Sequence, residues 1–507
     1  MASTTEQQWL EQARALVLRG DFQGAESLLD SALIGYPRSF ELRRLLAGVY
    51  RKTHRDDDAE ALLSGLLDER PQDAGCAFGL AELLIGQART RAAGRVLRIC
   101  FESGRQDVDL AIRAIEWLDE ADRKADAAAI AELAIATTPA DPRLHAYAGM
   151  LQLQLGAFDL ARERYLFALE HGPQACEWHV PQGLASAQRY DSPGHPDFAL
   201  FNACLQRTGL SDKARSTLLF ALGKAHDDVG DYAAAAGFFR QANALAHAQT
   251  RWSRKDWRRM VQARLGAKPV ASRDAKAGCF APIFIIGMPR SGTTLLAELL
   301  SRHPGVCNRG EMPWIAKLSE QPGLSGHAST EALARGAASY VMHARRDDAP
   351  DTTWFIDKQP LNFRYLDLIL ALFPNAKVIH CARNPRDTAL SLWMQSFRED
   401  VHGYAYDFED IAVVMHDCER LITHWQRFFP HAVRTVRYED LVSAPAAVLS
   451  GLTDWIGLPG TPASGRGPSS IDTASVWQAR QPIYSSSLQR WRAYADHVPE
   501  LLKFSAV

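Results

Sequence analysis

The sequence lacks a charge excess, paired cysteines and any long apolar run. Lys and Arg number 57 against 59 Asp and Glu, so the net charge of −2 gives no global reason to expect nucleic acid or an anionic membrane as partner. The eight cysteines are scattered without a C-x-x-C pair, which argues against a structural zinc site or a disulfide framework and suits a reducing compartment. No run approaches the roughly 20 apolar residues of a membrane span, and the start "MASTTEQQWLEQ" has no signal-peptide character. We therefore expect a soluble, cytoplasmic protein without a membrane span, a metal site or a nucleic-acid partner.

Most of the chain should fold, because 47% of its residues are hydrophobic and 23% are charged. Its 507 residues are enough for two or three domains. The sequence is Ala- and Leu-rich and helical in its first half, and from Cys279 on short apolar runs alternate with helical stretches. We therefore place the predicted boundary between residues 1–268 and 269–507.

Three series of residues recur at a spacing of 34 in the first half. The first is an alanine series, Ala25, Ala59, Ala93, Ala127 and Ala161. The second falls twelve places later, at Pro37, Pro71, Arg105, Pro139 and Pro173. The third falls twelve places before the alanines, at Ala13, Ala47, Ala81, Ile115 and Gly149. Three series in one frame, one of them mostly proline, indicate a structural repeat.

Small residues let two helices approach closely, and proline ends the second helix because it cannot continue it. This pattern resembles tetratricopeptide repeats, with five units over residues 7–175 and a further half-unit at 230–246 after an irregular insert at 189–197. The basic stretch 251–268 reads as a linking helix rather than a nucleic-acid site. The repeat domain either binds a protein partner on a concave surface, or packs on the second domain or forms a homodimer.

The second half reads as an α/β domain. Residues 283–287, 353–357, 377–382 and 434–439 are predicted strands with helical patterns between them. Such alternation predicts a parallel sheet with helices on both faces, where ligands bind beyond the carboxyl ends of the strands.

The first of these strands leads into "GMPRSGTT", which has the outline of a phosphate-binding loop. Gly287 and Gly292 permit a tight backbone path, and Arg290 can make a bidentate contact to an anion. Thr293 stands where a nucleoside triphosphatase has its lysine, which argues against ATP with Mg²⁺. The residues expected to hold the anion are Pro289, Arg290, Ser291, Gly292, Thr293 and Thr294.

A second anion site is predicted after the third strand, in "CARNPRDTALSLW". Arg383 leaves the strand, and Ser391 follows eight residues later in the next helix. Together with the first loop, they indicate a ligand with two separated phosphate groups.

The pair "PRSGTT" and "RNPRDTALSLW" resembles the sulfotransferases that use 3'-phosphoadenosine-5'-phosphosulfate (PAPS). The resemblance covers roughly residues 280–495 and is nearest to bacterial tetratricopeptide-repeat sulfotransferases and tyrosylprotein sulfotransferases. It implies that the first motif holds the 5'-phosphosulfate, with Arg290 at the reacting end, and that Arg383 and Ser391 hold the 3'-phosphate.

The same resemblance implies roles for five further residues. Glu311 in "NRGEMP" matches the glutamate base, and Lys358 in "IDKQP" matches a lysine near the transferring group. Tyr438 matches a tyrosine near the nucleotide, Ser475 a serine at the sulfate and Arg490 a basic residue at the 3'-phosphate. No histidine fits the base position of the cytosolic small-molecule sulfotransferases.

The sequence therefore predicts an enzyme that transfers a sulfuryl group from PAPS to an acceptor hydroxyl, releasing 3'-phosphoadenosine-5'-phosphate (PAP) without a metal. A protein tyrosine is one candidate acceptor, and a glycan, a lipid or a small metabolite stays open. The alternatives are a repeat scaffold whose α/β domain is a degenerate nucleotide-binding module, and a P-loop kinase, which the missing lysine disfavours.

Overall fold

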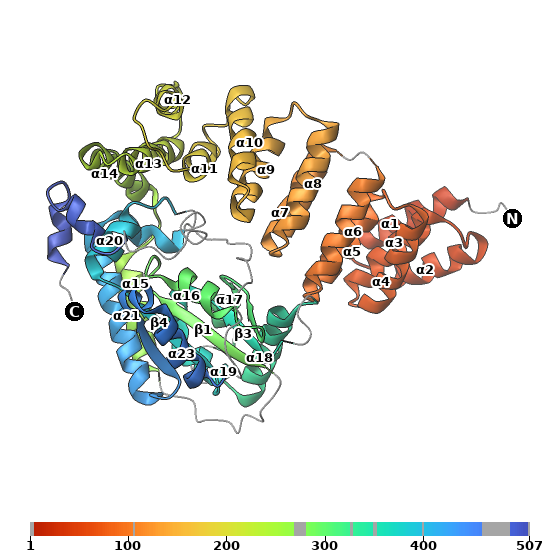
Figure 1. Cartoon of the computed structure of the whole chain (residues 1–507). Helices are drawn as coiled ribbons and strands as arrows, with labels where there is room; N and C mark the ends of the chain where they lie inside the picture. The colour runs from red at the N-terminus through yellow and green to blue at the C-terminus, as the bar shows by residue number, and fades with distance from the viewer. Residues whose placement is uncertain are drawn as a thin grey trace. The chain divides into compact units, whose positions relative to one another are not determined.

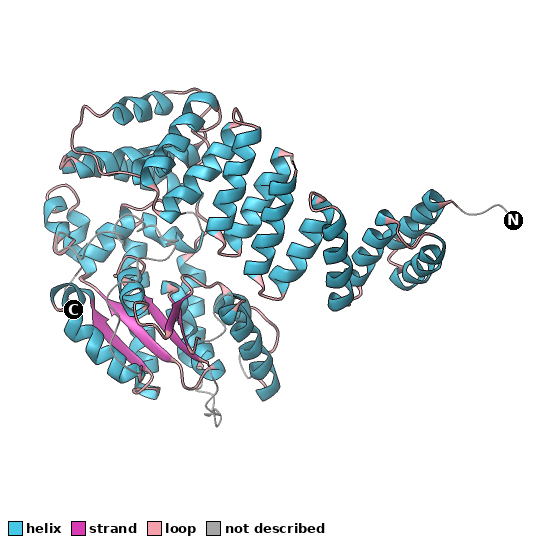
Figure 2. Ribbon diagram, turned by 45° about the vertical axis from the view of Figure 1, so that its right-hand side comes forward, coloured by secondary structure: helices cyan, strands magenta, loops and turns pink. Residues whose placement is uncertain are grey.

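The computed structural model describes residues 5–104, 107–267, 280–324, 328–347, 352–397, 400–458 and 487–504 (Figures 1 and 2). The chain forms two compact units, Met1–Leu151 with Arg346–Asp348, and Gln152–Arg345 with Ala349–Val507. The described part holds no helix that is long and apolar enough to cross a bilayer.

The first unit consists of helices that pack in successive pairs, α1 on α2, α3 on α4, α5 on α6 and α7 on α8. The bounds are α1 (Glu6–Leu18), α2 (Phe22–Gly35), α3 (Phe40–Lys52), α4 (Asp56–Glu69), α5 (Ala74–Gly86), α6 (Thr90–Ser103), α7 (Val108–Glu120) and α8 (Lys124–Thr137). A ninth helix, α9 (Pro142–Leu155), runs from this unit into the second.

The repeat series explain this pairing. All five alanines of the first series are 0% exposed, so each lies where its helix meets a neighbour. Pro37, Pro71 and Pro139 lie in the turns that follow the second helix of a pair, while Arg105 lies outside the described residues. The predicted tetratricopeptide-like hairpins are therefore confirmed.

The second unit begins with further helices. They are α10 (Phe158–His171), α11 (Val180–Ser186), α12 (Pro196–Leu205), α13 (Asp212–Asp228), α14 (Tyr232–Gln249) and α15 (Arg254–Gly266). Helix α14 contains residues 232–246 of the predicted extra half-unit and pairs with α13. Residues 189–195 of the irregular insert lie between α11 and α12, and its last two residues begin α12. The basic stretch forms α15, whose Trp257 is buried and donates a hydrogen bond to Asp417 (3.1 Å).

A five-stranded parallel sheet follows, in the order β2-β3-β1-β4-β5. Its strands are magenta in Figure 2. The strands are β1 (Ala281–Gly287), β2 (Val306–Asn308), β3 (Trp354–Asp357), β4 (Lys377–Ala382) and β5 (Val433–Arg437). Four of them were predicted. The fifth, β2, has only three residues and carries no apolar run that would mark it in the sequence.

Side chains of the central strand alternate between two cores. Ile283 and Ile285 pack with α16 (Thr293–Leu300) and α23 (Pro445–Ile456). Phe284 and Ile286 face the other core, which contains α18 (Thr330–Arg345), α19 (Leu366–Leu372) and α21 (Phe408–Phe428). The second core also includes Phe239 of α14 and Trp257 of α15, so these helices and the sheet share one apolar interior.

The remaining helices connect or follow the strands. They are α17 (Trp314–Ser319), α18 (Thr330–Arg345), α19 (Leu366–Leu372), α20 (Pro385–Trp393), α21 (Phe408–Phe428) and α22 (Tyr438–Ser443), with 3₁₀ helices η1 (Pro360–Tyr365), η2 (Asp400–Tyr406), η3 (Arg490–Tyr494) and η4 (Pro499–Lys503). Because β1 lies between β3 and β4, the loops after these three strands meet at one edge of the sheet, where α/β proteins bind ligands.

Candidate active site

The loop after β1 has the backbone geometry of an anion-binding turn. Gly292 has φ 98°, and a Cβ atom there would lie 2.3 Å from the Tyr438 ring, so only glycine fits. Arg290 also has a positive φ, 71°, which costs a non-glycine residue about 1–3 kcal/mol. The turn leads directly into α16, whose first N–H groups favour a bound anion.

Arg290 joins the loop after β1 to the helix after β4. Its Nε donates to the hydroxyl of Ser391 in α20 (3.0 Å), and its carbonyl oxygen accepts from Nη1 of Arg383 (2.9 Å). The two predicted anion-binding motifs, 93 residues apart at these arginines, are therefore in direct contact. The role of Ser391 at the 3'-phosphate, together with Arg383, stays a prediction.

Tyr438 and the C-terminal segment surround the second arginine. The Arg383 guanidinium lies 4.6 Å from the centre of the Tyr438 ring, and its Nη2 donates to the Ser487 carbonyl (2.7 Å). The Tyr438 and Ser487 hydroxyls are hydrogen-bonded to each other (2.8 Å). The chain thus brings together residues from the loop after β4, from α22 and from the segment after residue 486.

Two hydrogen-bond donor groups in this region are buried without a hydrogen-bond partner in the described chain, the Ser291 hydroxyl and Nε of Arg383. Leaving such a group unsatisfied costs about 1–3 kcal/mol. A hydroxyl and a guanidinium N–H are both donors to phosphate or sulfate oxygens. The donor set therefore fits an anionic ligand at both loops.

The predicted base and its lysine form an ion pair. The backbone N–H of Lys358 donates to the carbonyl of Gly310 (2.8 Å), which brings the start of the 311–319 segment beside the end of β3. Nζ of Lys358 then contacts the carboxylate of Glu311. Lys358 is almost fully buried, while a third of the Glu311 side chain is exposed. The carboxylate therefore remains reachable from solvent, and the lysine supports it from within.

Asp357, the last residue of β3, is a buried carboxyl group that the sequence analysis did not single out. It is 1% exposed and accepts from the Tyr340 hydroxyl (2.9 Å) and from Nδ2 of Asn362 (3.4 Å). Burial raises the pKa of Asp357 to about 7, against a smaller lowering by Tyr340. The sequence offered one signal, a carboxylate at a strand end next to Lys358, but burial cannot be read from it.

Two predicted residues lie in the C-terminal segment. Ser475 lies outside the described residues, so its role stays a prediction. Arg490 is described, and it forms an ion pair with Asp227 of α13. Its role at the 3'-phosphate stays a prediction. Among the described residues, no group of three or more His, Cys, Asp or Glu is arranged to hold a metal ion.

Comparison with known proteins agrees with this geometry. Residues 282–462 match the sequence model of the sulfotransferase family, and residues 16–75 match that of a tetratricopeptide repeat. The chain combines tetratricopeptide repeats with a sulfotransferase-family domain. The sulfotransferase domain contains both loops, the Glu311–Lys358 pair and Tyr438, whereas Arg490 lies beyond the matched range.

Two relatives and one solved structure show the extent of the similarity. An uncharacterised protein of Aquifex aeolicus is 30% identical over 59% of this chain and 42% of its own length. Protein-tyrosine sulfotransferase A of Caenorhabditis elegans is 26% identical over 35% of this chain and 50% of its own length. The sulfotransferase domain of the Synechococcus PCC 7002 olefin synthase is 24% identical over 47% of this chain and 98% of that domain, with a TM-score of 0.31. The chain thus spans half or less of the length of these two curated relatives.

Proposed function

We propose that the chain transfers a sulfuryl group from PAPS to an acceptor hydroxyl and releases PAP. The observation that carries this proposal is the contact between the two anion-binding loops, where Arg383 donates to the backbone of Arg290. Loops after neighbouring strands of a parallel sheet can together hold one ligand with two anionic groups. The buried, unpartnered donors of Ser291 and Arg383 support the same ligand class.

A different set of residues is proposed to bind each end of the nucleotide. Bound PAPS supplies an activated sulfuryl group on the 5' side of its nucleoside. Arg290, Ser291 and the N–H groups at the start of α16 bind that end, together with Thr293 and Thr294. Arg383 and Tyr438 bind the other end, where the cation lies on the aromatic ring. Positioning and charge stabilisation of this kind supply most of the acceleration in related group transfers.

Glu311 is the proposed general base. Its exposed carboxylate accepts the proton of the acceptor hydroxyl as the oxygen attacks. Lys358 holds that carboxylate in place and can move its ammonium group towards negative charge that develops on the departing oxygen. Ser475 is proposed to assist there.

We propose a protein tyrosine as the acceptor. Two features support it, the repeat array, which suits an extended peptide, and the similarity to relatives named protein-tyrosine sulfotransferases. A glycan, a lipid and a small metabolite are the competing acceptors. Incubation with ³⁵S-labelled PAPS and one representative of each class distinguishes them: label on the tyrosine peptide alone supports the proposal, and label on another class replaces it.

Calorimetric titration tests the identity of the proposed sulfuryl donor. The full chain should bind PAP and discriminate against ATP, and Arg290→Ala and Arg383→Ala should each weaken PAP binding by about a hundredfold or more, as expected for losing charge-assisted bonds. Arg302→Ala is the matched control, because Arg302 is exposed just beyond α16. Wild-type PAP affinity in either site variant would contradict the assignment. PAP binding without transfer to any acceptor would favour the scaffold alternative, and a strict Mg²⁺ requirement would favour a kinase.

Two further predictions stay open beside this proposal. The repeat domain is proposed to bind a protein partner or to form a homodimer, and the location is proposed to be cytoplasmic. The boundary at residues 268/269 lies where the chain is outside the described residues, and it stays a prediction about the sequence domains.

A further inference from the structure

The segment that begins at Ser487 is fastened to the candidate nucleotide site. Its first described residue accepts a hydrogen bond from Arg383 and pairs with the Tyr438 hydroxyl. Arg490, three residues later, begins η3. Arg490 therefore lies three residues from a direct contact with Arg383, which is proposed to bind the 3'-phosphate.

Asp387 of α20 fixes the backbone on both sides of Arg490. Its Oδ2 accepts from the N–H of Gln489 (2.8 Å), and its Oδ1 accepts from the N–H of Trp491 (3.0 Å). The carboxylate is buried, at 3% exposure. With both flanking peptide groups held, the Arg490 side chain has a defined starting point and direction.

The far end of the Arg490 side chain is held by a different element. Asp227, in the last turn of α13, pairs through Oδ2 with Nη2 of Arg490 and accepts through Oδ1 from the Tyr494 hydroxyl (2.6 Å). Asp227 is 7% exposed, so both of its oxygens are used in a buried setting. A buried carboxylate with charged and neutral donors on its two oxygens is a rigid anchor.

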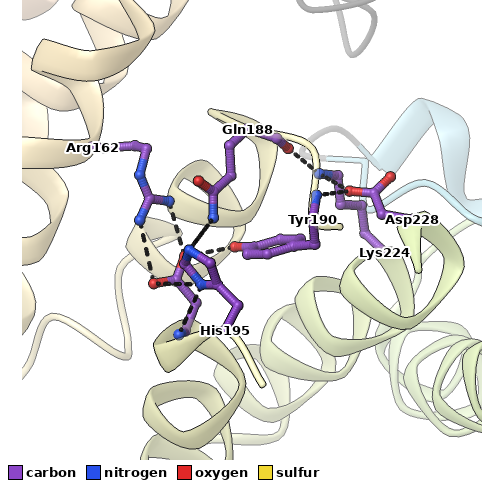
Figure 3. A network of polar contacts seen from close by, with 7 residues as sticks. Arg162, Gln188, Tyr190, His195, Lys224 and Asp228 are labelled. Carbon is purple, nitrogen blue, oxygen red and sulfur yellow. Dashed lines mark hydrogen bonds and ion pairs between the residues drawn. The ribbon is translucent and has the colours of Figure 1, made fainter. Parts of the chain in front are cut away.

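The end of α13 is itself immobilised by the insert between α11 and α12 (Figure 3). Asp228, the neighbour of Asp227, accepts from Nζ of Lys224 (2.6 Å) and from the N–H of Tyr190 (3.1 Å). The Tyr190 hydroxyl donates to Asp197 (2.7 Å), which Arg162 also binds (2.9 Å). This network positions the final turn of α13 and therefore the carboxylate of Asp227.

We propose that Asp227 is a positioning residue of the nucleotide site, which holds Arg490 so that its other N–H groups face the 3'-phosphate of PAP. A guanidinium carries five N–H donors, so the Asp227 contact leaves donors available for an anion. Without the carboxylate the arginine would lose its orientation and regain side-chain freedom, which PAP would then have to restrict on binding. This inference rests on the proposed PAP site, and it makes a helix outside the sulfotransferase match part of nucleotide recognition.

The test compares PAP with adenosine 5'-monophosphate (AMP), which differs from PAP only by lacking the 3'-phosphate. In the full-length chain, Asp227→Asn should weaken PAP binding about tenfold, the order expected for disturbing one charge-assisted contact, and leave AMP binding unchanged. Tyr494→Phe removes one bond to Asp227 and should give a smaller loss, again only for PAP. Asp212→Asn, an exposed carboxylate at the start of the same helix, is the matched control and should change neither affinity.

A double-mutant cycle separates positioning from general damage. In an Arg490→Gln background, Asp227→Asn should have no further effect on PAP affinity, because the two residues act through one contact. Equal weakening of PAP and AMP, unchanged or tighter PAP binding in Asp227→Asn, or a full additional loss in the Arg490→Gln background would each overturn the inference. Should Asp227→Asn fail to fold, Tyr494→Phe decides by the same PAP-to-AMP comparison. A wild-type chain that does not bind PAP at all would instead refute the proposed function.

Discussion

The carboxylate of Glu311 and the ammonium group of Lys358 neutralise each other at the carboxyl end of β3. The pair explains how a lysine can be almost fully buried without an uncompensated charge, since burial of an unpaired ammonium is expensive. It also holds the carboxylate of the proposed base in one direction.

Replacing Glu311 with glutamine should slow transfer strongly while leaving PAP binding intact. The amide keeps the shape of the side chain but cannot accept the hydroxyl proton, so we expect kcat to fall by about 10²–10⁴-fold. Steady-state rates and calorimetric PAP affinity measure the two effects. Glu320→Gln, at an exposed site beyond α17, should behave as wild type. Normal turnover by Glu311→Gln would require another base.

Asp357 gives the stability of the chain a pH dependence of known sign. Its pKa is raised by burial from 3.8 to about 7, so its protonated form is favoured in the folded state. The contribution of Asp357 to the free energy of unfolding is fully present below about pH 4 and is lost as the pH rises towards about 7. The full contribution is about 4 kcal/mol.

Asp357→Asn should remove that dependence, because the amide remains neutral and can still accept from Tyr340. Scanning calorimetry at pH 5 and pH 8 measures the effect as a difference in melting temperature between variant and wild type. The variant should gain several degrees relative to wild type on going from pH 5 to pH 8. A difference that does not change with pH, or changes in the opposite direction, would show that Asp357 titrates normally.

The turn between β1 and α16 depends on its glycine. Alanine at position 292 would place Cβ at 2.3 Å from Tyr438 while forcing a φ of 98° on an L-residue, so the loop or the ring must move. Gly292→Ala should therefore reduce PAP affinity by at least about tenfold in a calorimetric titration. Gly237→Ala is the control, because that position on α14 has open space and alanine favours a helix there. Equal PAP affinity in the two variants would refute the packing argument.

At the scale of elements, the sequence predicts the helices that belong to a repeat and the strands that form an apolar run. Ala59 and Ala93 could be assigned to helix contacts because a period of 34 fixes their place in a hairpin, and β4 could be bounded because its apolar run is clear. The sequence cannot predict which side chains of separate loops meet. The hydrogen bond between Ser391 and Arg290 is an example, because it depends on how α20 packs on the loop after β1.

Other contacts could not be predicted from the sequence because they join residues that are far apart in the chain. Asp227 lies 263 residues before Arg490, and neither sequence spacing nor helical periodicity connects them. Asp387 stands within the recognised motif "RNPRDT", yet its partners Gln489 and Trp491 are more than 100 residues away. Contacts of this kind become visible only when the tertiary structure places their elements together.

At the scale of the whole chain, the apolar interior of the second unit contains both α13–α15 and the sheet. Phe239 and Trp257 lie in the same core as Phe284 and Phe363, so separating them would expose a large apolar surface. A chain that lacks residues 1–137 should therefore still fold its sheet and bind PAP with wild-type affinity. A chain that begins at residue 269 should lose both.

Far-ultraviolet circular dichroism, cooperative melting and PAP titration of the two truncated chains test this expectation. Retained folding and PAP binding by the 269–507 chain would show that α13–α15 are dispensable for both. Loss of PAP binding on removal of residues 1–137 would show that the first unit contributes to the nucleotide site.

The proposed function requires the loop after β1 and the loop after β4 to bind a single nucleotide. Hydrogen–deuterium exchange of the full chain with and without saturating PAP tests it most directly. We predict slower exchange in residues 287–296 and 383–391 together, with no comparable change on adding ATP. Protection of only one of the two loops, or of neither, would contradict the claim.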